Sequence, residues 1–344
     1  MLILFSHFEL PFIYLISVVI SLALILLIIN LNTSGLNLQK YRRLHINATT
    51  MAYICLALTL GTILYTLSTG VGVYFNLDFD KVYEFRSDIS SSLPGIAGYL
   101  IAFVTKVITP TLGVLGIVLR KYILTFLSII LSILLFGLTS HKAVLFYPII
   151  GILIYIFFSR LRLYMMATVI AGLAALSLIG LKLGSGFEWI YFLLIDRTIY
   201  VPSAINFAFY DWFSNEANNL VLWSDSKITF GLMQPRYSLP TTSLIGLSYF
   251  GDERIIANTG WIGSGVSHFG LTGLFLYATL MGLIFRILDK NAIRLGPRLV
   301  TSLSLSALVS PMLSTDLPNG FLTHGVLVAL TILYFIKTEA QVEK

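Results

Sequence analysis

The sequence predicts an all-α membrane protein that crosses a bilayer many times. Of its 344 residues, 57% are apolar and only 11% are charged, against about 25% charged in soluble domains. The mean hydropathy is +0.89. Apolar runs approach the length of about 20 residues that a spanning helix needs, and they lack the two-residue alternation of barrel strands. These observations exclude a soluble enzyme, a coiled coil, a disordered chain, a single-helix anchor and a porin-type barrel.

We expect nine spanning helices, most of them without any charged residue. Because the N-terminus lacks a basic region and a cleavage signal, the first apolar run is expected to be a retained helix rather than a signal peptide. The predicted spans are 11–31, 46–68, 95–119, 122–139, 143–159, 163–181, 266–285, 299–315 and 321–337.

A tenth apolar segment, 188–209, contains two acidic residues, an arginine and a proline. Charged centres are costly in lipid, so we interpret it as a re-entrant or interfacial helix on the outer side. The chain then divides into an N-terminal bundle of six spans (1–181), a long loop (182–265) and three C-terminal spans (266–344).

Lysine and arginine gather in alternate connections between the predicted spans. One set of connections is strongly basic and the other is net acidic, and basic loops face the cytoplasm. We therefore expect the loops at about 69–94 and 182–265 on the outer face of the membrane. The net charge of +6 is then a topology signature rather than a nucleic-acid surface. Lys106 lies inside a span, where a function and snorkelling beside Pro110 are the two interpretations.

Cysteine and histidine provide no framework for a metal or a disulfide. Cys55 is the single cysteine, and the five histidines are far apart in sequence without metal-ligand spacing. We expect neither a metal nor another cofactor. His268 lies near the end of a span among small residues, where close helix packing is one interpretation and catalysis the other.

The long loop gathers aromatic side chains. All four tryptophans, including Trp261, and several tyrosines, including Tyr200, lie in this region. Aromatic rings anchor proteins at membrane interfaces, and this is one interpretation. The other is stacking against the C–H faces of sugar rings.

The same region carries cations on a face that is otherwise acidic. The fork of donors on arginine matches phosphate and diphosphate oxygens, whereas pairing with a neighbouring carboxylate is the alternative. Asp252 and Glu253 directly precede Arg254, which leaves both interpretations open. The cations are Arg197, Arg236, Arg254 and, from a short neighbouring connection, Lys142.

The end of the loop resembles the O-antigen polymerases (Wzy family), which share a superfamily with the O-antigen ligases. The stretch reads Asn258-Thr-Gly-Trp-Ile-Gly-Ser-Gly-Val-Ser-His-Phe-Gly-Leu-Thr-Gly273. Phe269, Gly270 and Gly273 match an aromatic-Phe-Gly-x-x-Gly element of the family, with His268 where a tyrosine is common. Further resemblances are the Arg-x10-Gly pattern from Arg254 to Gly265, Arg197-Thr-Ile-Tyr-Val-Pro-Ser203 and Thr139-Ser-His-Lys142.

The resemblance implies a metal-independent glycosyltransferase of O-antigen lipopolysaccharide biosynthesis, in the bacterial inner membrane with the long loop in the periplasm. Such an enzyme transfers the growing glycan from undecaprenyl diphosphate to the non-reducing end of a new undecaprenyl-diphosphate-linked repeat unit. Membrane lipids and a polysaccharide chain-length regulator are the other expected partners. The diphosphate leaving group needs charge neutralisation, and the acceptor hydroxyl needs a base. The resemblance implies catalytic roles for Arg254, Arg197, Asp252, Glu253 and His268, and substrate contacts for Lys142, Arg236, Tyr200, Trp261 and Gly265.

Three alternatives stay open. An O-antigen ligase shares the arginine-rich outer loop and transfers finished glycan to the lipid A core. A transporter or flippase of lipid-linked sugars places charges and broken helices near mid-membrane, often in repeated halves. A membrane acyltransferase is the weakest alternative, because its histidine chemistry favours a donor site near the cytoplasm.

Overall fold

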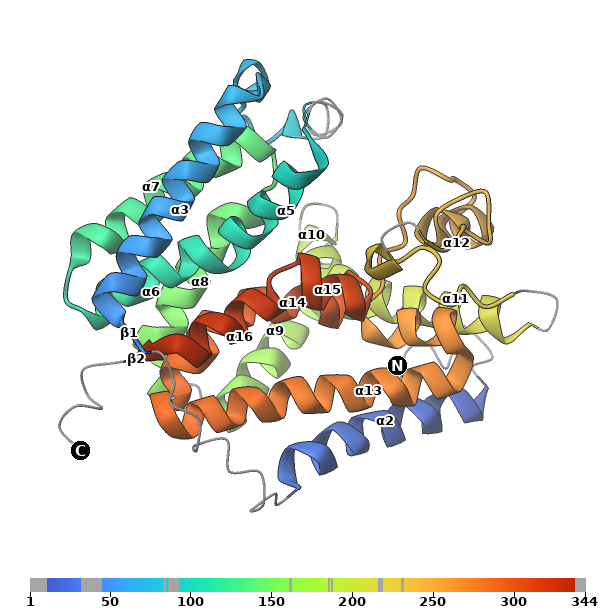
Figure 1. Cartoon of the computed structure of the whole chain (residues 1–344). Helices are drawn as coiled ribbons and strands as arrows, with labels where there is room; N and C mark the ends of the chain where they lie inside the picture. Colours follow the sequence, from blue (N-terminus) through green and yellow to red (C-terminus); the bar gives the residue numbers. More distant parts are fainter. Residues whose placement is uncertain are drawn as a thin grey trace. The chain divides into compact units, whose positions relative to one another are not determined.

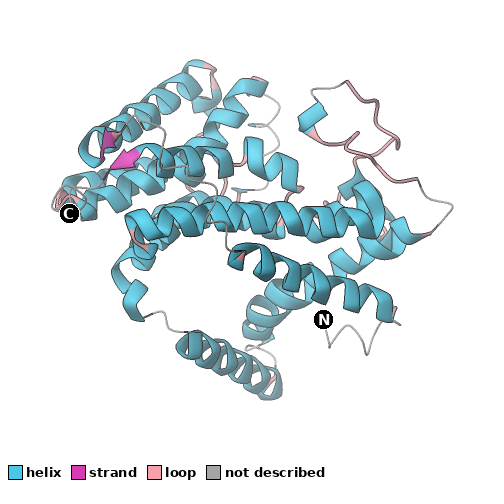
Figure 2. Ribbon diagram, turned by 60° about the horizontal axis from the view of Figure 1, so that its bottom comes forward, coloured by secondary structure: helices cyan, strands magenta, loops and turns pink. Residues whose placement is uncertain are grey.

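The computed structural model describes residues 11–31, 45–82, 85, 89, 93–160, 163–184, 186, 188–215, 219–229 and 232–337. Within these ranges the chain is almost wholly helical (Figures 1 and 2). The strands of this described part are β1 (Ile46–Asn47) and β2 (Ile336–Lys337), paired in parallel with Ile46 opposite Ile336. Residues 1–10, residues 32–44 of the first predicted inner connection and much of the charged stretch 83–92 lie outside the described residues.

The α-helices cover every predicted span. Their bounds are α2 (Phe12–Asn30), α3 (Ala48–Ser68), α5 (Gly95–Phe103), α6 (Thr109–Val118), α7 (Tyr122–Thr139), α8 (Ala143–Phe157), α9 (Leu163–Leu183), α10 (Glu188–Tyr191), α11 (Val201–Ser214), α12 (Thr241–Phe250), α13 (Trp261–Leu295), α14 (Pro297–Leu313), α15 (Leu317–Thr323) and α16 (Val326–Phe335).

The protein is an all-α, multi-pass membrane protein, as predicted. Among the described residues, five helices are long and apolar enough to cross a membrane: α2, α3, the joined α5–α6 helix, α7 and α13. α15 and α16 meet at a bend of 48° and together provide a sixth candidate. α8 and the described apolar part of α9 are shorter. These helices are shorter than a full span, so the number of nine membrane crossings stays a prediction.

The chain forms two compact units, each assembled from three stretches of sequence. The first unit consists of Met1–Leu31, Ser159–Arg286 and Ser310–Asn319, and the second of Asn32–Phe158, Ile287–Val309 and Gly320–Lys344. Because both units draw on the N-terminal and C-terminal parts of the chain, they do not follow the three consecutive segments described from the sequence. The segments 1–181, 182–265 and 266–344 therefore describe the order of elements along the chain and not the compact units.

Close backbone approach holds the second unit together. A side chain at Gly113 would meet the Ser128 hydroxyl of α7, and one at Gly116 would meet the Thr125 backbone. The Thr125 hydroxyl instead donates to the Gly113 carbonyl at 3.0 Å. Small residues that let helices approach, together with hydroxyl hydrogen bonds between them, are typical of membrane bundles.

Lys106 occupies an irregular place in this second unit. It lies in a π-helical turn, Val104–Ile108, that joins α5 to α6. Its backbone carbonyl accepts a hydrogen bond from the Ser306 hydroxyl of α14 at 2.5 Å. π-Helical turns inside helices are rare and occur often at functional sites, which is consistent with the functional interpretation of Lys106.

In the first unit, α2 lies along α13 (Figure 1). A side chain at Gly282 of α13 would meet Ile28 of α2, so the glycine permits this contact. Arg286 of α13 donates to the carbonyls of Ile28 and Leu31 at the end of α2. The last carbonyls of a helix have no partner within the helix, so the arginine caps α2 with the charge that suits its end.

α13 is interrupted near its start. Phe269 (φ −142°, ψ 22°) and Gly270 (φ 64°, ψ −151°) leave the helical conformation, and the chain reverses direction there (Figure 1). Gly265 and Gly273 lie in contact across the break, where a side chain at Gly265 would come within 2.8 Å of the Gly273 carbonyl oxygen. The glycine-rich stretch therefore builds a helical hairpin, and the long part of α13 begins after Gly270 rather than at residue 266.

The segment 188–209 is helical, as predicted. α10, a π-helical stretch at Phe192–Tyr200 and α11 follow one another without a gap, so the helix extends to Ser214. Tyr210 of α11 stacks on Tyr14 of α2 with ring centroids 4.4 Å apart, and Phe207 lies beside both. This packing ties the segment to a predicted spanning helix of the same unit. Its position relative to a bilayer stays a prediction.

Candidate functional site

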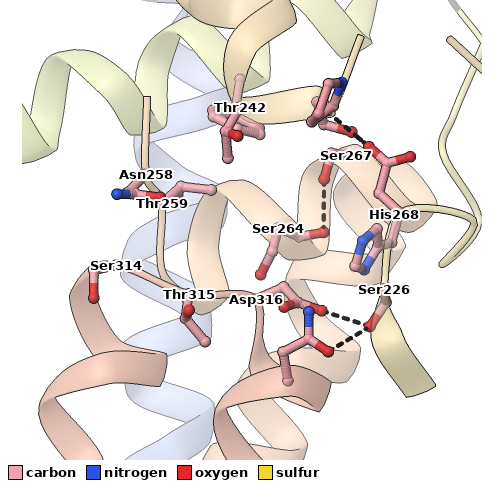
Figure 3. Close-up of a pocket in the computed structure, with 15 residues that line it drawn as sticks. Ser226, Thr242, Asn258, Thr259, Ser264, Ser267, His268, Ser314, Thr315 and Asp316 are labelled. Atoms are coloured by element: carbon pink, nitrogen blue, oxygen red, sulfur yellow. Dashed lines mark hydrogen bonds between the residues drawn. The ribbon is translucent and has the colours of Figure 1, made fainter. Parts of the chain in front are cut away.

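The first unit contains a polar cavity of about 200 Å³ (Figure 3). Its wall comes from α11, the connection between α11 and α12, the start of α12, the connection between α12 and α13, the short first part of α13 and the junction of α14 with α15. Two carboxylates, two amides, one imidazole and a ring of hydroxyls line it. The lining residues are Phe209, Asp225, Ser226, Pro240, Thr241, Thr242, Asn258, Thr259, Ser264, Ser267, His268, Ser314, Thr315, Asp316 and Asn319.

Asn206 of α11 fixes the start of α13 at this cavity. Its side-chain oxygen accepts from the Thr259 hydroxyl at 2.7 Å and from the Gly263 amide at 3.1 Å. The first amides of a helix have no partner within the helix, so this side chain acts as a cap supplied by another helix. Gly260 approaches the Met312 carbonyl so closely that any side chain there would clash. Both contacts hold the short first part of α13 against its neighbours.

The turn at 221–226 presents Asp225 and Ser226 to the cavity. Leu222 (φ 51°) and Trp223 (φ 66°) both have left-handed backbone conformations, which is uncommon for side chains of this size. The Val221 amide donates to the Ser267 carbonyl of α13 at 2.8 Å and anchors the turn. Backbone strain of this kind persists only where the surrounding structure imposes it, and it concentrates at functional sites.

The two carboxylates are held by hydroxyl and amide donors. Asp225 accepts from the Thr241 amide at 2.8 Å and from the Thr241 hydroxyl, at the start of α12. Asp316 accepts from the Ser226 hydroxyl at 2.8 Å, as the dashed line in Figure 3 shows. Burial raises the pKa of the Asp316 carboxyl, the hydrogen bonds from Ser226 and Asn319 oppose the rise, and the Asp225 charge adds to it.

His268 completes a hydrogen-bonded chain with two aromatic side chains. The Trp223 indole N–H donates to the Tyr277 hydroxyl at 2.7 Å, and that hydroxyl lies 2.6 Å from Nδ1 of His268. The Tyr277 hydroxyl accepts from the indole and meets Nδ1 as donor or as acceptor, depending on the imidazole tautomer. Nε2 has no hydrogen-bond partner among the described residues, although only 4% of the His268 surface is exposed. The imidazole therefore offers the cavity a polar nitrogen.

Of the residues expected from the sequence to be catalytic, the cavity contains His268. Arg254 has 87% of its side chain exposed and pairs with Asp252, with 2.8 Å between Nη2 and Oδ2. Hydrogen bonds from Arg254 lower the pKa of Asp252. Glu253 is exposed beside them, and Arg197 lies exposed over the Phe192 ring, 5.4 Å from its centroid. None of these four side chains lines the cavity.

The residues expected to contact substrate are also dispersed. Trp261 is buried at the start of α13, and Gly265 makes the hairpin contact described above. Tyr200 is half-buried at the start of α11, and Arg236 is exposed in the loop before α12. Lys142 belongs to the second unit, where its ammonium lies 5.5 Å from the centroid of the Phe79 ring.

Sequence reasoning missed the two cavity carboxylates. Asp316 interrupts an apolar region between two predicted spans, next to Ser314 and Thr315. An ionisable residue in such a place is by default a functional hypothesis, and that signal was available. Asp225 carries no such signal, because it lies in a polar loop among many similar residues.

No group of three or more histidine, cysteine, aspartate or glutamate side chains that would hold a metal ion occurs in the described part of the chain. Comparison with known proteins gives no match to a family model, a curated protein or a solved structure.

Proposed function

We propose that this protein polymerises lipid-linked oligosaccharide repeat units on the periplasmic face of the inner membrane. In this reaction a glycan leaves one undecaprenyl diphosphate and joins the non-reducing sugar of a second lipid-linked unit. The observation that carries the proposal is the cavity itself, where two half-buried carboxylates lie beside neutral hydrogen-bonding groups inside a unit built from apolar helices. Sugar hydroxyls both donate and accept hydrogen bonds, so this lining suits them.

Asp316 supplies the base in this proposal. The acceptor hydroxyl oxygen forms a bond to the anomeric carbon of the glycan, and the bond from that carbon to the diphosphate oxygen breaks. The hydroxyl proton passes to the Asp316 carboxylate, and the diphosphate leaves with the bonding electron pair. A base works best when its pKa lies near the working pH, and burial moves the pKa of Asp316 in that direction.

The leaving diphosphate belongs outside the cavity. None of the described lining residues carries a positive charge, and two carboxylates repel an anion. Arg197, Arg236 and Arg254 are exposed on the same unit and have the donor geometry that diphosphate needs. The Asp252–Arg254 pair is open to solvent, which screens it and leaves the guanidinium able to exchange partners.

The test is the length distribution of surface polysaccharide after deletion of the gene. We expect the ladder of chain lengths to collapse to a single repeat unit, and plasmid-borne wild-type protein to restore it. The Arg254→Ala variant is expected to reach the membrane at normal level and to leave the ladder missing. An intact ladder in the deletion strain contradicts the proposal, whereas loss of all glycan from the lipid core indicates the ligase alternative.

A transporter of lipid-linked sugars is the second candidate, because two helices break at the cavity. α13 reverses at Phe269–Gly270, and the chain leaves helical conformation between α14 and α15 just before Asp316. Transporters commonly form their substrate sites from such interrupted helices. Purified protein in liposomes separates the two activities, since a polymerase makes a longer glycan and a transporter moves the unchanged lipid-linked unit to the other leaflet.

A further inference from the structure

We propose that the cavity is the subsite for the acceptor sugar and that it selects by charge, accepting a neutral or amino sugar and rejecting an acidic one. This inference rests on the proposed function and adds the class of sugar. It concerns one ring of the acceptor glycan, because a cavity of about 200 Å³ has the volume of about seven water molecules.

The charge of the cavity wall determines the selection. Asp225 and Asp316 line it from two different segments of the chain, and none of the described lining residues is a lysine or an arginine. A uronic acid or a phosphorylated sugar would bring its own negative charge against both carboxylates without a cation to offset it. An ammonium group on an amino sugar would instead be attracted by them.

His268 presents a polar nitrogen to the cavity. The residue is 4% exposed, and its Nε2 makes no hydrogen bond among the described residues. Nε2 is not one of the side-chain atoms that are both fully buried and without a partner, so it is open to the cavity that His268 lines and can bind a polar group there. In Figure 3, His268, Ser226 and Asp316 border the same space. A hydroxyl of a sugar placed there can form a hydrogen bond with Nε2 and donate to the carboxylate.

Two apolar side chains also line the cavity. They are Phe209 of α11, with 1% of its surface exposed, and Pro240, before α12. A sugar ring has apolar C–H faces as well as polar hydroxyls, so it has a counterpart for both kinds of lining residue. A free inorganic cation would be satisfied by the oxygens alone and would make no use of the apolar side chains.

The experiment measures binding of sugars to the purified full-length protein in detergent. The probes are methyl glycosides of the gluco, galacto and manno series, each as the neutral sugar, the 2-amino sugar and the uronic acid. Tryptophan fluorescence reports binding, since Trp223 is connected through Tyr277 to His268. In at least one series we expect the neutral and amino forms to bind at least tenfold more tightly than the uronic acid.

Variants assign that discrimination to the cavity. In the Asp225→Asn/Asp316→Asn protein, the preference against the uronic acid is expected to fall below about threefold, and the preference for the amino form is expected to disappear. The matched control is Asp289→Asn, an exposed carboxylate of α13 outside the lining, which is expected to keep the wild-type order. The circular dichroism spectrum of each variant shows whether it is folded.

Three results overturn the inference: equal binding of acidic and neutral forms, no binding in any series, or wild-type discrimination in the double variant. Binding that follows the predicted charge order, in a protein whose deletion leaves the polysaccharide ladder intact, refutes the polymerase and leaves the sugar subsite in place. Failure of the subsite and failure of the proposed function are therefore distinguishable.

Discussion

Two regions of the first unit contain carboxylates with hydrogen-bond donors, and they differ in how the chain builds them. Asp252 and Arg254 are two residues apart and paired with each other, with the arginine side chain 87% and the aspartate side chain 34% exposed. Asp316, which is half-buried, and Ser226, which is buried, are 90 residues apart and joined by one hydrogen bond. The first arrangement needs only a local turn, whereas the second needs several helices in place. We therefore expect substitutions in the cavity to affect both activity and stability, and substitutions at the surface pair to leave stability unchanged.

The largest effect is expected from Asp316→Asn. Asparagine keeps the size and the hydrogen bond from Ser226 but cannot take a proton, and a positioned base contributes about 100-fold or more to rate. The rate of glycan extension by purified protein with lipid-linked oligosaccharide measures the loss. Asp289→Asn provides the control, and an activity within threefold of wild type in Asp316→Asn would show that Asp316 is not the base.

The next largest effect concerns the hairpin that holds His268 at the cavity. A methyl group at Gly273 would meet the Gly265 carbonyl and Phe269 Cβ, so we expect Gly273→Ala to destabilise the protein by about 2 kcal/mol. Gly98→Ala is the matched control, because nothing lies within 4 Å of a side chain there and alanine favours helices. Thermal unfolding in detergent compares the two, and equal melting temperatures would argue against the tight hairpin.

A smaller effect is expected from Tyr277→Phe, which removes a hydroxyl that contacts both Trp223 and His268. Leaving buried donors or acceptors without partners costs about 1–3 kcal/mol. The imidazole also loses the contact that selects its tautomer, so the pH dependence of activity is expected to change along with the melting temperature. Tyr249→Phe is the comparison, since its partner Asp211 lies at the surface and outside the cavity lining. A shift confined to melting temperature would limit Tyr277 to a structural role.

These differences also explain which parts of the fold and of the site could be predicted from the sequence. Long apolar runs act locally, so the helices and the membrane class were predictable from composition and spacing. The arginine at position 254 was visible for the same reason, as a cation beside two acids in one short stretch. The cavity was not, because Asp225, Asp316 and Asn206 reach their partners only through tertiary contacts. His268 was identified as a candidate, but its orientation depends on a reversal of α13 that a single-span interpretation did not include.

The pH dependence of stability is expected to differ modestly between the wild type and Asp316→Asn. Burial raises the pKa of Asp316, whereas in the unfolded chain it ionises near its ordinary value of about 4. Its contribution to stability is complete below pH 4 and is lost as the pH rises through the folded pKa, where a carboxylate must be buried. Asparagine does not titrate, so the melting temperature of wild type relative to Asp316→Asn is expected to fall from pH 4 toward pH 8. A constant or rising difference would contradict this assignment.

The smallest change in stability is expected from Arg254→Ala. Its guanidinium is solvent-exposed, and its one ion pair, among the described residues, is with Asp252 two residues away. Exposed ion pairs contribute little because water and salt screen them. We therefore expect the melting temperature to stay within about 1 °C of wild type, even though the polysaccharide ladder is lost. Loss of glycan transfer without loss of stability is what a diphosphate contact predicts, because the partner that Arg254 would hold in catalysis is the substrate rather than the protein. A marked fall in melting temperature would instead make Arg254 a structural residue, and the comparison between the two regions would no longer hold.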